Sequence, residues 1–469
     1  MPKPEPHPRS GPYTRCDPHT RCGPHTRLPH TRLGPQARWA SAAVATGAFC
    51  VQWDSFALSP ALPVVRDALH GSATATPWVV SGYLLAAGSL MPVAGRLGDL
   101  YGRRRMLILG LSLFGVTSVL CALAPSLPLL VAARVGQGAG GALIMPSGLA
   151  LLTNACPPGR ARRVTGRALG LAGLATVCGP FLGGMLARSV SWRAVFWLTV
   201  PLALAAALCA RRAAESRAPD AGPSLDAAGA VTATGALACL ARWLDDTAAW
   251  AWVTGAALLG ALFVRAERRS PDPLVDLALF RNRPYVALTV AGAVANSAIV
   301  ALLYVVPLML QRGQGWPGPA AGVAFLAPAA ALAAGGPTAG RVRPAAAVPV
   351  MALCLAAAAA ALGACEHAAD TSALLLASTG AAAALGVAGG LALTGTQATV
   401  RRERAGEASG VTKAVMTATA GAGLALTGTA TTSGDGRPSL ALPAAACLAT
   451  AAALVLVRVR GRHRPGRHG

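Results

Sequence analysis

The sequence predicts an all-α protein that crosses a membrane many times. Of its 469 residues, 54% are hydrophobic and only 13% are charged, whereas a soluble globular protein carries about 25% charged residues. Apolar runs of roughly 17 to 25 residues recur along the chain, and each is long enough to cross about 30 Å of hydrocarbon as a helix. The composition therefore indicates a polytopic membrane protein.

Fourteen of these runs are predicted to be membrane helices. Their boundaries are 39–60, 78–95, 105–123, 128–152, 166–187, 193–210, 225–241, 250–264, 285–310, 320–340, 345–364, 371–395, 407–430 and 439–457. The alanine-rich third quarter of the chain blurs its boundaries, so the number could differ by two.

The net charge of +23 follows the pattern of a membrane protein rather than that of a nucleic-acid-binding protein. All but seven of the 41 Lys and Arg residues lie on one side of the predicted topology. The exceptions are Arg134, within a predicted helix, and six residues of the outer loops: Arg66, Arg188, Arg193, Arg242, Arg312 and Arg437. By the positive-inside rule, both chain termini are predicted to be cytoplasmic.

The segments outside the helices define the predicted domains. Residues 1–38 form a basic tail rich in Pro, His and Arg, which is predicted to be disordered; a metal-sensing role for its His and Cys residues is an alternative. Two six-helix halves, 39–210 and 285–457, flank a two-helix insert and linker at 211–284, and a basic tail follows at 458–469. Paired halves around a central site are typical of secondary transporters.

No metal centre or cofactor is predicted in the membrane region. Most of the 11 cysteines occur singly inside apolar runs, where they behave as small hydrophobic residues.

A short charged hairpin, GRLGDLYGRRR at 95–105, joins the second and third predicted helices. Gly95 is expected to let two helices approach closely, and Gly102 to permit a tight turn. Asp99 is the one acid among the arginines of this hairpin and opposes the positive-inside pattern, so it is expected to have a partner. A plain basic loop is the alternative.

Two charged residues are predicted to lie within the hydrocarbon. Asp54 is the one acid placed well inside a predicted span, which makes it the default proton site; an acid at the outer rim is the alternative. Arg134 lies several residues into the fourth helix, so it should face a cavity or a carboxylate unless its side chain snorkels to the interface.

The fifth predicted helix contains a helix breaker among glycines. Pro180 removes an intrahelical hydrogen bond and should kink the helix. The glycines that flank it, Gly170, Gly179, Gly183 and Gly184, are expected to permit tight packing against the other half of the molecule. Generic packing of small residues is the alternative.

These motifs together resemble the signature set of the major facilitator superfamily, in its 14-helix branch of drug:proton antiporters. The resemblance rests on the 95–105 hairpin, on Arg134-Val-Gly-Gln137-Gly and on Gly179-Pro180-Phe-Leu-Gly183-Gly184. The stretch from Asp54 to Pro63 is similar to the helix 1 signature of that branch, although Phe56 and Ser59 depart from it.

The resemblance implies a role for each motif. Gly95, Asp99, Gly102, Arg103 and Arg104 would form a conformational latch on the cytoplasmic side. Arg134 would take part in proton coupling with Asp54. The glycines and proline of the fifth helix would form the antiporter motif, which favours efflux over uptake. Phe49, Trp53 and Gln137 are candidate residues for lining the substrate cavity.

The carboxyl-terminal half departs from the family pattern. Gly340-Arg-Val-Arg343 stands where a second copy of the hairpin is often found but has no acid, and Lys413 replaces a usual Asn.

The predicted function is proton-coupled export of amphipathic organic compounds by alternating access, by a monomer in the cytoplasmic membrane. No P-loop that would indicate direct use of ATP is present, and no cluster of acids and histidines indicates an enzyme. A narrow-specificity metabolite transporter of the same fold and a degenerate member that does not transport are the alternatives.

Overall fold

The computed structural model describes residues 34–462, apart from gaps at 59–60, 73–74, 77, 158–159, 218–225, 246–249, 271–272, 274, 276, 311–315, 317–322, 402–404 and 433–438. The described residues form helices and connecting segments, with no β-strand among them. Of the predicted tails, 1–38 and 458–469, the parts at 1–33 and 463–469 lie outside the described residues. Residues 35–38 and 458–462 are helical, so the predicted disorder of 35–38 was wrong.

A helix lies in each segment that the sequence predicted, although the one described within 320–340 has only 14 residues. The first group of elements is α1 (Pro35–Phe56), α2 (Leu62–Ala68), α3 (Trp78–Tyr101), α4 (Arg103–Leu123), α5 (Leu127–Ala155), α6 (Ala161–Leu186), η2 (Ala187–Ser191) and α7 (Arg193–Arg211). Then follow α8 (Ala227–Asp245), α9 (Trp250–Glu267) and η3 (Leu277–Arg281). The last group is α10 (Arg283–Leu308), α12 (Leu326–Ala339), η5 (Pro344–Ala346), α13 (Ala347–Glu366), α14 (Thr371–Ala398), α15 (Ala405–Thr432) and α16 (Ala441–Arg462).

Several helices begin where the local sequence dictates. Asn282 and Asp370 are N-caps: the Asn282 Oδ1 accepts from the Tyr285 N–H at 3.3 Å, and the Asp370 Oδ1 from the Ala373 N–H at 2.7 Å. Each satisfies a backbone donor that a helix terminus leaves without a partner. Proline occupies the first turn of α1, α5 and α10, where its missing N–H costs no helical hydrogen bond.

The hydropathy of the helices identifies a multi-pass membrane protein. Seven of the described helical segments are long and apolar enough to span a bilayer, and α6 makes eight if its two bent parts are one span. The predicted number of fourteen spans stays a prediction.

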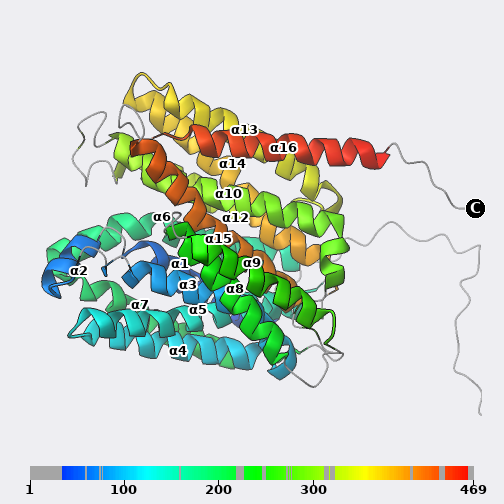
Figure 1. Ribbon diagram of the computed structural model, residues 1–469, viewed down its shortest axis with the longest axis horizontal. Helices are drawn as coiled ribbons and strands as arrows, with labels where there is room; N and C mark the ends of the chain where they lie inside the picture. The colour runs from blue at the N-terminus through cyan, green and yellow to red at the C-terminus, as the bar shows by residue number, and fades with distance from the viewer. Residues whose placement is uncertain are drawn as a thin grey trace, which may run out of the picture.

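The helices gather into two groups (Figure 1). The amino-terminal group, α1–α7, is drawn in blue to cyan-green, and its members pack through pairs such as α3–α5, α4–α5 and α1–α6. The carboxyl-terminal group, α10–α16, packs through pairs such as α12–α14, α13–α14 and α10–α15. Helix α6 packs on α12, and α15 packs on α3 and α5, so these pairs join the two groups.

Helices α8 and α9 pack on each other and lie against the junction of the two groups. Helix α8 contacts both α3 and α15, and its Thr234 hydroxyl donates to the Ser89 carbonyl of α3 at 3.3 Å. A small apolar cluster joins Ala230 and Ala233 of α8 to Val93 of α3 and Val411 of α15. The insert is therefore anchored on the two helices that meet between the groups.

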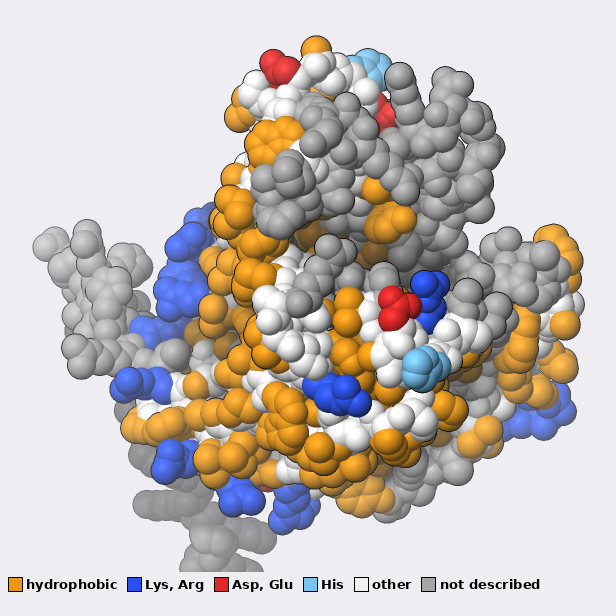
Figure 2. Space-filling model, turned by 90° about the vertical axis from the view of Figure 1, so that its left-hand side faces the viewer, with side chains coloured by type: hydrophobic (Ala, Val, Ile, Leu, Met, Phe, Trp, Pro, Cys, Tyr) orange, Lys and Arg blue, Asp and Glu red, His pale blue; other side chains and the backbone are white. Residues whose placement is uncertain are grey.

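The surface of the bundle is apolar, as expected for contact with lipid. Figure 2 views the end of the bundle that carries α2, and hydrophobic side chains also line the edges of that view, where the flanks of the bundle begin. Leucines such as Leu123, Leu204 and Leu353 are each at least 60% exposed, which would be unfavourable in water. They fit a hydrocarbon environment.

Glycines permit the contact between α6 and α12. A Cβ added to Gly170 would lie 2.7 Å from the Pro337 Cδ and 2.8 Å from the Ala333 carbonyl oxygen, and one added to Gly173 would lie 3.1 Å from the Ala333 Cα. Gly166 and Gly336 approach each other in the same way. Close approach of two helices through small residues is the usual basis of packing within a membrane.

A larger residue at Gly170 should therefore destabilise the contact between the groups. We expect Gly170→Leu to lower the midpoint of thermal unfolding in detergent, because overpacking costs about 1–3 kcal/mol. Gly363→Leu on α13 is the control, since a Cβ there would meet nothing within 4 Å. Equal stability of the two variants would contradict this packing.

Candidate transport site

The centre of the amino-terminal group holds a buried ion pair. The Arg134 guanidinium on α5 donates through Nη1 to the Asp54 Oδ2 on α1, and both side chains are 0% exposed. Neither side chain is exposed, and Asp54 lies in the last turn of α1 and Arg134 in the second turn of α5. Their depth in the membrane stays a prediction. The sequence placed both charges within the hydrocarbon, and the structure brings them together.

Further groups hold the Arg134 guanidinium in place. Its Nε donates to the Val79 carbonyl at 2.8 Å, and its Nη1 donates to the Gln137 Oε1 at 2.8 Å. Its Cζ lies 4.2 Å from the centroid of the Tyr83 ring and 5.8 Å from that of Phe196. Both rings offer π faces to the cation. The charge is thus stabilised by a carboxylate, two further acceptors and two aromatic rings.

Gln137 extends this network to α4. Its amide Nε2 donates to the Ser118 hydroxyl at 2.8 Å, and the Ser118 hydroxyl donates to the Phe114 carbonyl at 2.7 Å. The Cys121 thiol lies 3.6 Å from the Gln137 Oε1. The side chain expected to line a cavity therefore lies inside the ion-pair network in this conformation.

Asp54 keeps one oxygen without a hydrogen bond. Its Oδ2 binds Arg134, whereas its buried Oδ1 has no hydrogen-bond partner among the described residues. A carboxylate has acceptor capacity on both oxygens, so the Oδ1 is the atom of this pair at which a proton can bind.

The other two candidate cavity residues stack beside Asp54. The rings of Phe49 and Trp53 are 6.3 Å apart at their centroids and nearly parallel. The Trp53 indole donates to the Val195 carbonyl of α7 at 3.3 Å and is 1% exposed. It packs with Ala57, Ala175 and Val195, so this conformation places Trp53 in the packed interior between α1, α6 and α7.

The charged hairpin forms a contact between the two groups of helices. The Arg103 Nη2 at the start of α4 donates to the Asp99 Oδ1 at 2.7 Å, and both side chains are buried. The Asp99 Oδ2 accepts from the Glu407 backbone N–H in the first turn of α15 at 3.1 Å. One carboxylate thus binds an arginine of its own group and the amino-terminal end of a helix of the other group, where negative charge is favoured.

Gly95 makes this contact possible. A Cβ added there would lie 2.6 Å from the Gly406 carbonyl oxygen, and one added to Gly406 would lie 2.5 Å from the Asp99 Oδ1. Only glycine fits either position, so α3 and α15 approach backbone to backbone beside the Asp99 carboxylate.

Glu215 is a second acid of this region, which the sequence motifs did not indicate. Its Oε1 accepts from the Arg104 backbone N–H at 2.9 Å, and its Oε2 lies 3.6 Å from the Arg104 Nε. It also packs under Gly102, whose φ of +108° requires glycine. Glu215 is a single acid in the basic segment 211–217. The argument that identified Asp99, an acid among arginines that needs a partner, could have identified Glu215 from the sequence as well.

The glycine and proline motif of α6 produces the predicted bend. The helix bends by 41° between Ala161–Thr176 and Cys178–Leu186. Pro180 has no N–H to donate to the carbonyl of Thr176, one turn earlier, and this accounts for the position of the bend. Pro180 and Gly184 are half-buried.

The partner of these glycines differs from the prediction. Gly179 lies against Phe56 and Ala57, and a Cβ on Gly183 would collide with the Ala57 backbone, so both pack on the end of α1 within their own group. The prediction of packing against the other half was therefore wrong for Gly179 and Gly183, although it holds for Gly170 of the same segment. Gly166 and Gly170, nearer the start of α6, make that contact instead.

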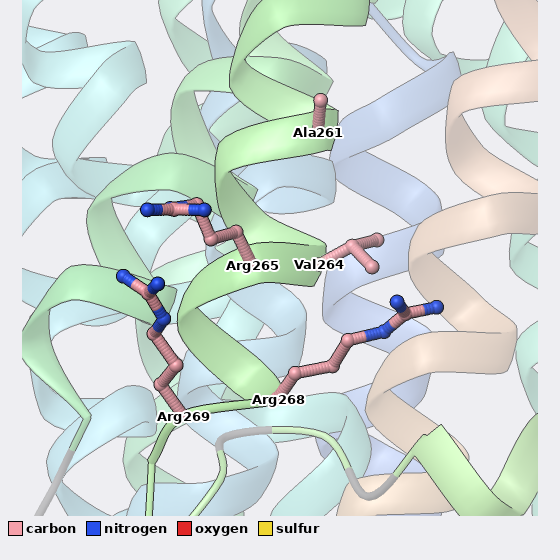
Figure 3. Close-up of a pocket in the computed structure, with 5 residues that line it drawn as sticks. All are labelled: Ala261, Val264, Arg265, Arg268 and Arg269. Atoms are coloured by element: carbon pink, nitrogen blue, oxygen red, sulfur yellow. The ribbon is translucent and has the colours of Figure 1, made fainter.

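A shallow hollow lies at the end of α9, away from these motifs. It is lined by Ala261, Val264, Arg265, Arg268 and Arg269, and Figure 3 shows the three guanidinium groups projecting from the helix end. These arginines belong to a segment that the charge distribution predicted to be cytoplasmic. Among the described residues, no group of three or more His, Cys, Asp or Glu side chains could hold a metal ion.

Comparison with known proteins identifies the family to which this chain belongs. Residues 44–425 match the Major Facilitator Superfamily, so the chain belongs to that family of transporters. The human organic anion transporter MFSD10 has a similar structure, with a TM-score of 0.68 over 90% of this chain and 100% of that one, at 15% identity. The predicted fold class and family are confirmed.

Bacterial relatives include proteins named for resistance and export. The tetracenomycin C resistance and export protein of Streptomyces glaucescens is 36% identical over 64% of this chain and 57% of its own length. The multidrug efflux pump LfrA of Mycolicibacterium smegmatis is 34% identical over 58% of this chain and 56% of its own. The lincomycin resistance protein of Streptomyces lincolnensis is 32% identical over 62% of each chain. The matched region thus spans a little over half the length of these relatives.

Breaking the Asp54–Arg134 pair should destabilise the protein. We expect Arg134→Gln to lower the midpoint of thermal unfolding in detergent markedly, because leaving one buried charge without its partner costs about 3–5 kcal/mol. The double variant Asp54→Asn/Arg134→Gln should recover part of the loss. Asp67→Asn, in an exposed ion pair with Arg66, is the control and should change little. A double variant with the summed loss of both single variants would argue against the pairing.

The contact between Asp99 and α15 should control the separation of α3 from α15. Spin labels at Tyr101, the last residue of α3, and at Arg401, between α14 and α15, are both at exposed positions. They would report the separation of the two groups at this end as a distance distribution. We expect Asp99→Asn to broaden it toward longer distances, because a neutral amide loses the ion pair with Arg103 and binds the helix end more weakly. Asp67→Asn is the control, since Asp67 forms only an exposed ion pair with Arg66 among the described residues. Identical distributions for all three proteins would contradict a latch.

Proposed function

We propose that this chain is a proton-coupled exporter of amphipathic organic compounds in the cytoplasmic membrane. The observation that carries the proposal is the buried Asp54–Arg134 pair with its open Oδ1. Acids inside membrane helices typically mark ion pathways and proton relays. The named activities of the bacterial relatives, resistance, export and multidrug efflux, support export as the direction.

Proton binding at Asp54 would change the balance of charges at the centre of the amino-terminal group. The carboxylate now offsets the Arg134 charge in a site without solvent exposure. A proton on the Oδ1 would remove that offset and weaken the hold of Asp54 on Arg134. Five helices contribute side chains or carbonyls to this site, so a change there would be transmitted to the packing of the whole group.

The Asp99 contact would control the conformational change of the transport cycle. With both termini cytoplasmic, the α3–α15 contact lies at the cytoplasmic side, and this conformation is closed there. Rocking of the half 39–210 against the half 285–457, with the insert 211–284 between them, would break the Glu407 N–H contact and open that side. Such rocking around a central site is typical of transporters with two repeats.

The other assigned residues have roles that follow from their contacts. Gly95, Gly102, Arg103 and Arg104 shape the latch, and Gly179, Pro180, Gly183 and Gly184 set the bend of α6 against α1. Phe49, Trp53 and Gln137 would meet substrate only in a conformation that loosens their present packing. The functional unit proposed here is the monomer.

The membrane potential can supply the energy for proton-coupled export. Each proton that crosses 100 mV releases about 2.3 kcal/mol, and no nucleotide or cofactor is needed.

Ethidium accumulation in a host without its own efflux pumps tests the proposal. Cells with the wild-type protein should accumulate less ethidium than cells with empty vector, and a protonophore should abolish the difference. Asp54→Asn should behave like the vector because it cannot exchange a proton, whereas the control Asp67→Asn should behave like the wild type.

Two results would count against the proposal. Wild-type accumulation equal to that of the vector, with the protein confirmed in the membrane, would reject broad export and favour a narrow-specificity or non-transporting member. Full export by Asp54→Asn would remove Asp54 from the coupling mechanism.

A further inference from the structure

Helix α15 carries a buried lysine at the boundary between the two groups. Lys413 is 9% exposed. Three other residues of α15 face α3: Gly406 lies against Asp99, Gly410 against Met91, and Thr417 against Gly88. Lys413 is three residues after Gly410 and four before Thr417, so it lies on the same side of the helix. Its ammonium therefore belongs to the boundary where the groups meet.

Lys413 differs from the other buried cations in having no counter-ion. The buried cations among the described residues are Arg103, Arg134 and Lys413. Arg103 pairs with Asp99, and Arg134 pairs with Asp54. Within the same described part of the chain, no hydrogen bond or ion pair involves the Lys413 ammonium.

The residues around Lys413 offer no counter-ion for its ammonium among the described residues. The facing stretch of α3 from Gly88 to Gly95 contains no charged residue. The neighbouring Thr412 hydroxyl already bonds with Thr289 and with the Tyr285 hydroxyl, at 3.2 Å each. The nearest buried acid on α3, Asp99, already binds Arg103 and the α15 backbone. The charge is thus not used to join the two groups in this conformation.

A buried cation without a partner is unfavourable in the membrane, and such residues usually serve a ligand or an ion. Its position favours a ligand over a second proton site: the Asp54–Arg134 pair lies inside one group, whereas a transported compound passes between the groups. A negatively charged group of that compound would supply the missing counter-ion.

We propose that Lys413 binds an ionised acidic group of the exported compound, a carboxylate or a phenolate, and so adds anionic amphipathic compounds to the substrates that the protein exports. This inference rests on the proposed export function and names its substrate class.

A comparison of two dyes with the same ring system but opposite charge tests whether Lys413 recognises the charge of the substrate. Fluorescein is anionic and rhodamine 123 is cationic, and both have a xanthene core. Uptake of each dye into energised everted membrane vesicles would be measured for the wild type, Lys413→Met and Lys413→Arg, with protein levels matched by immunoblot. Methionine keeps an unbranched side chain without the charge, and arginine keeps the charge.

We expect the wild type to transport fluorescein in a protonophore-sensitive manner. Lys413→Met should reduce that transport at least about tenfold, which corresponds to the loss of one charged hydrogen bond. Lys413→Arg should retain most fluorescein transport, and rhodamine 123 transport should not fall in Lys413→Met.

Three results would overturn the inference. Fluorescein transport that Lys413→Met leaves unchanged would remove Lys413 from recognition while leaving export intact. Equal loss of both dyes in Lys413→Met would assign the lysine to the transport cycle instead of to substrate charge. If wild-type vesicles transport neither dye while cells with the wild-type protein still accumulate less ethidium than the vector control, anionic substrates are rejected. If none of the three dyes is transported, the export function itself is rejected.

Discussion

The buried ion pair between Asp54 and Arg134 is the constraint on which the amino-terminal group depends. An arginine inside the hydrocarbon costs at least about 2.5–3.5 kcal/mol without a partner. Five helices meet to satisfy it: α1 supplies Asp54, α3 supplies the Val79 carbonyl and the Tyr83 ring, α4 supplies Ser118 by way of Gln137, and α7 supplies Phe196. The packing of these helices is therefore tied to the charge state of one carboxylate.

A second carboxylate ties this group to the rest of the molecule. Asp99 binds Arg103 on one side and the first turn of α15 on the other, beside glycines that let the backbones touch. Around Asp99 and between α6 and α12, the helices of the two groups meet through polar or small-residue contacts. Contacts of this kind are suited to an interface that must open and close, because little apolar packing is lost on separation.

The sequence predicted the positions of the helices well and the partners of the functional residues less well. Long apolar runs fix helix positions locally, so a helix occurs at each predicted segment. Asp54 and Arg134 were each recognised as unusual charges, but 80 residues separate them, and no local pattern says that they pair. Asp99 is 308 residues from Glu407, whose backbone N–H it accepts from, so only the fold could identify this partner.

The glycines of α6 show the same limit. Their spacing indicates a close helix contact, yet it does not say with which helix, and the structure assigns Gly179 and Gly183 to α1 and Gly166 and Gly170 to α12. Glu215 was missed because it belongs to no motif. Its single negative charge in a basic segment could have been interpreted as Asp99 was.

Proton release on substrate binding tests the central claim most directly. Purified protein in detergent and weak buffer would be mixed with ethidium, and the pH change followed with an indicator dye. The account predicts that substrate binding displaces a proton from the wild-type protein and none from Asp54→Asn, although both bind ethidium. Equal proton release from the two proteins would show that the Asp54 carboxyl is not the coupling group.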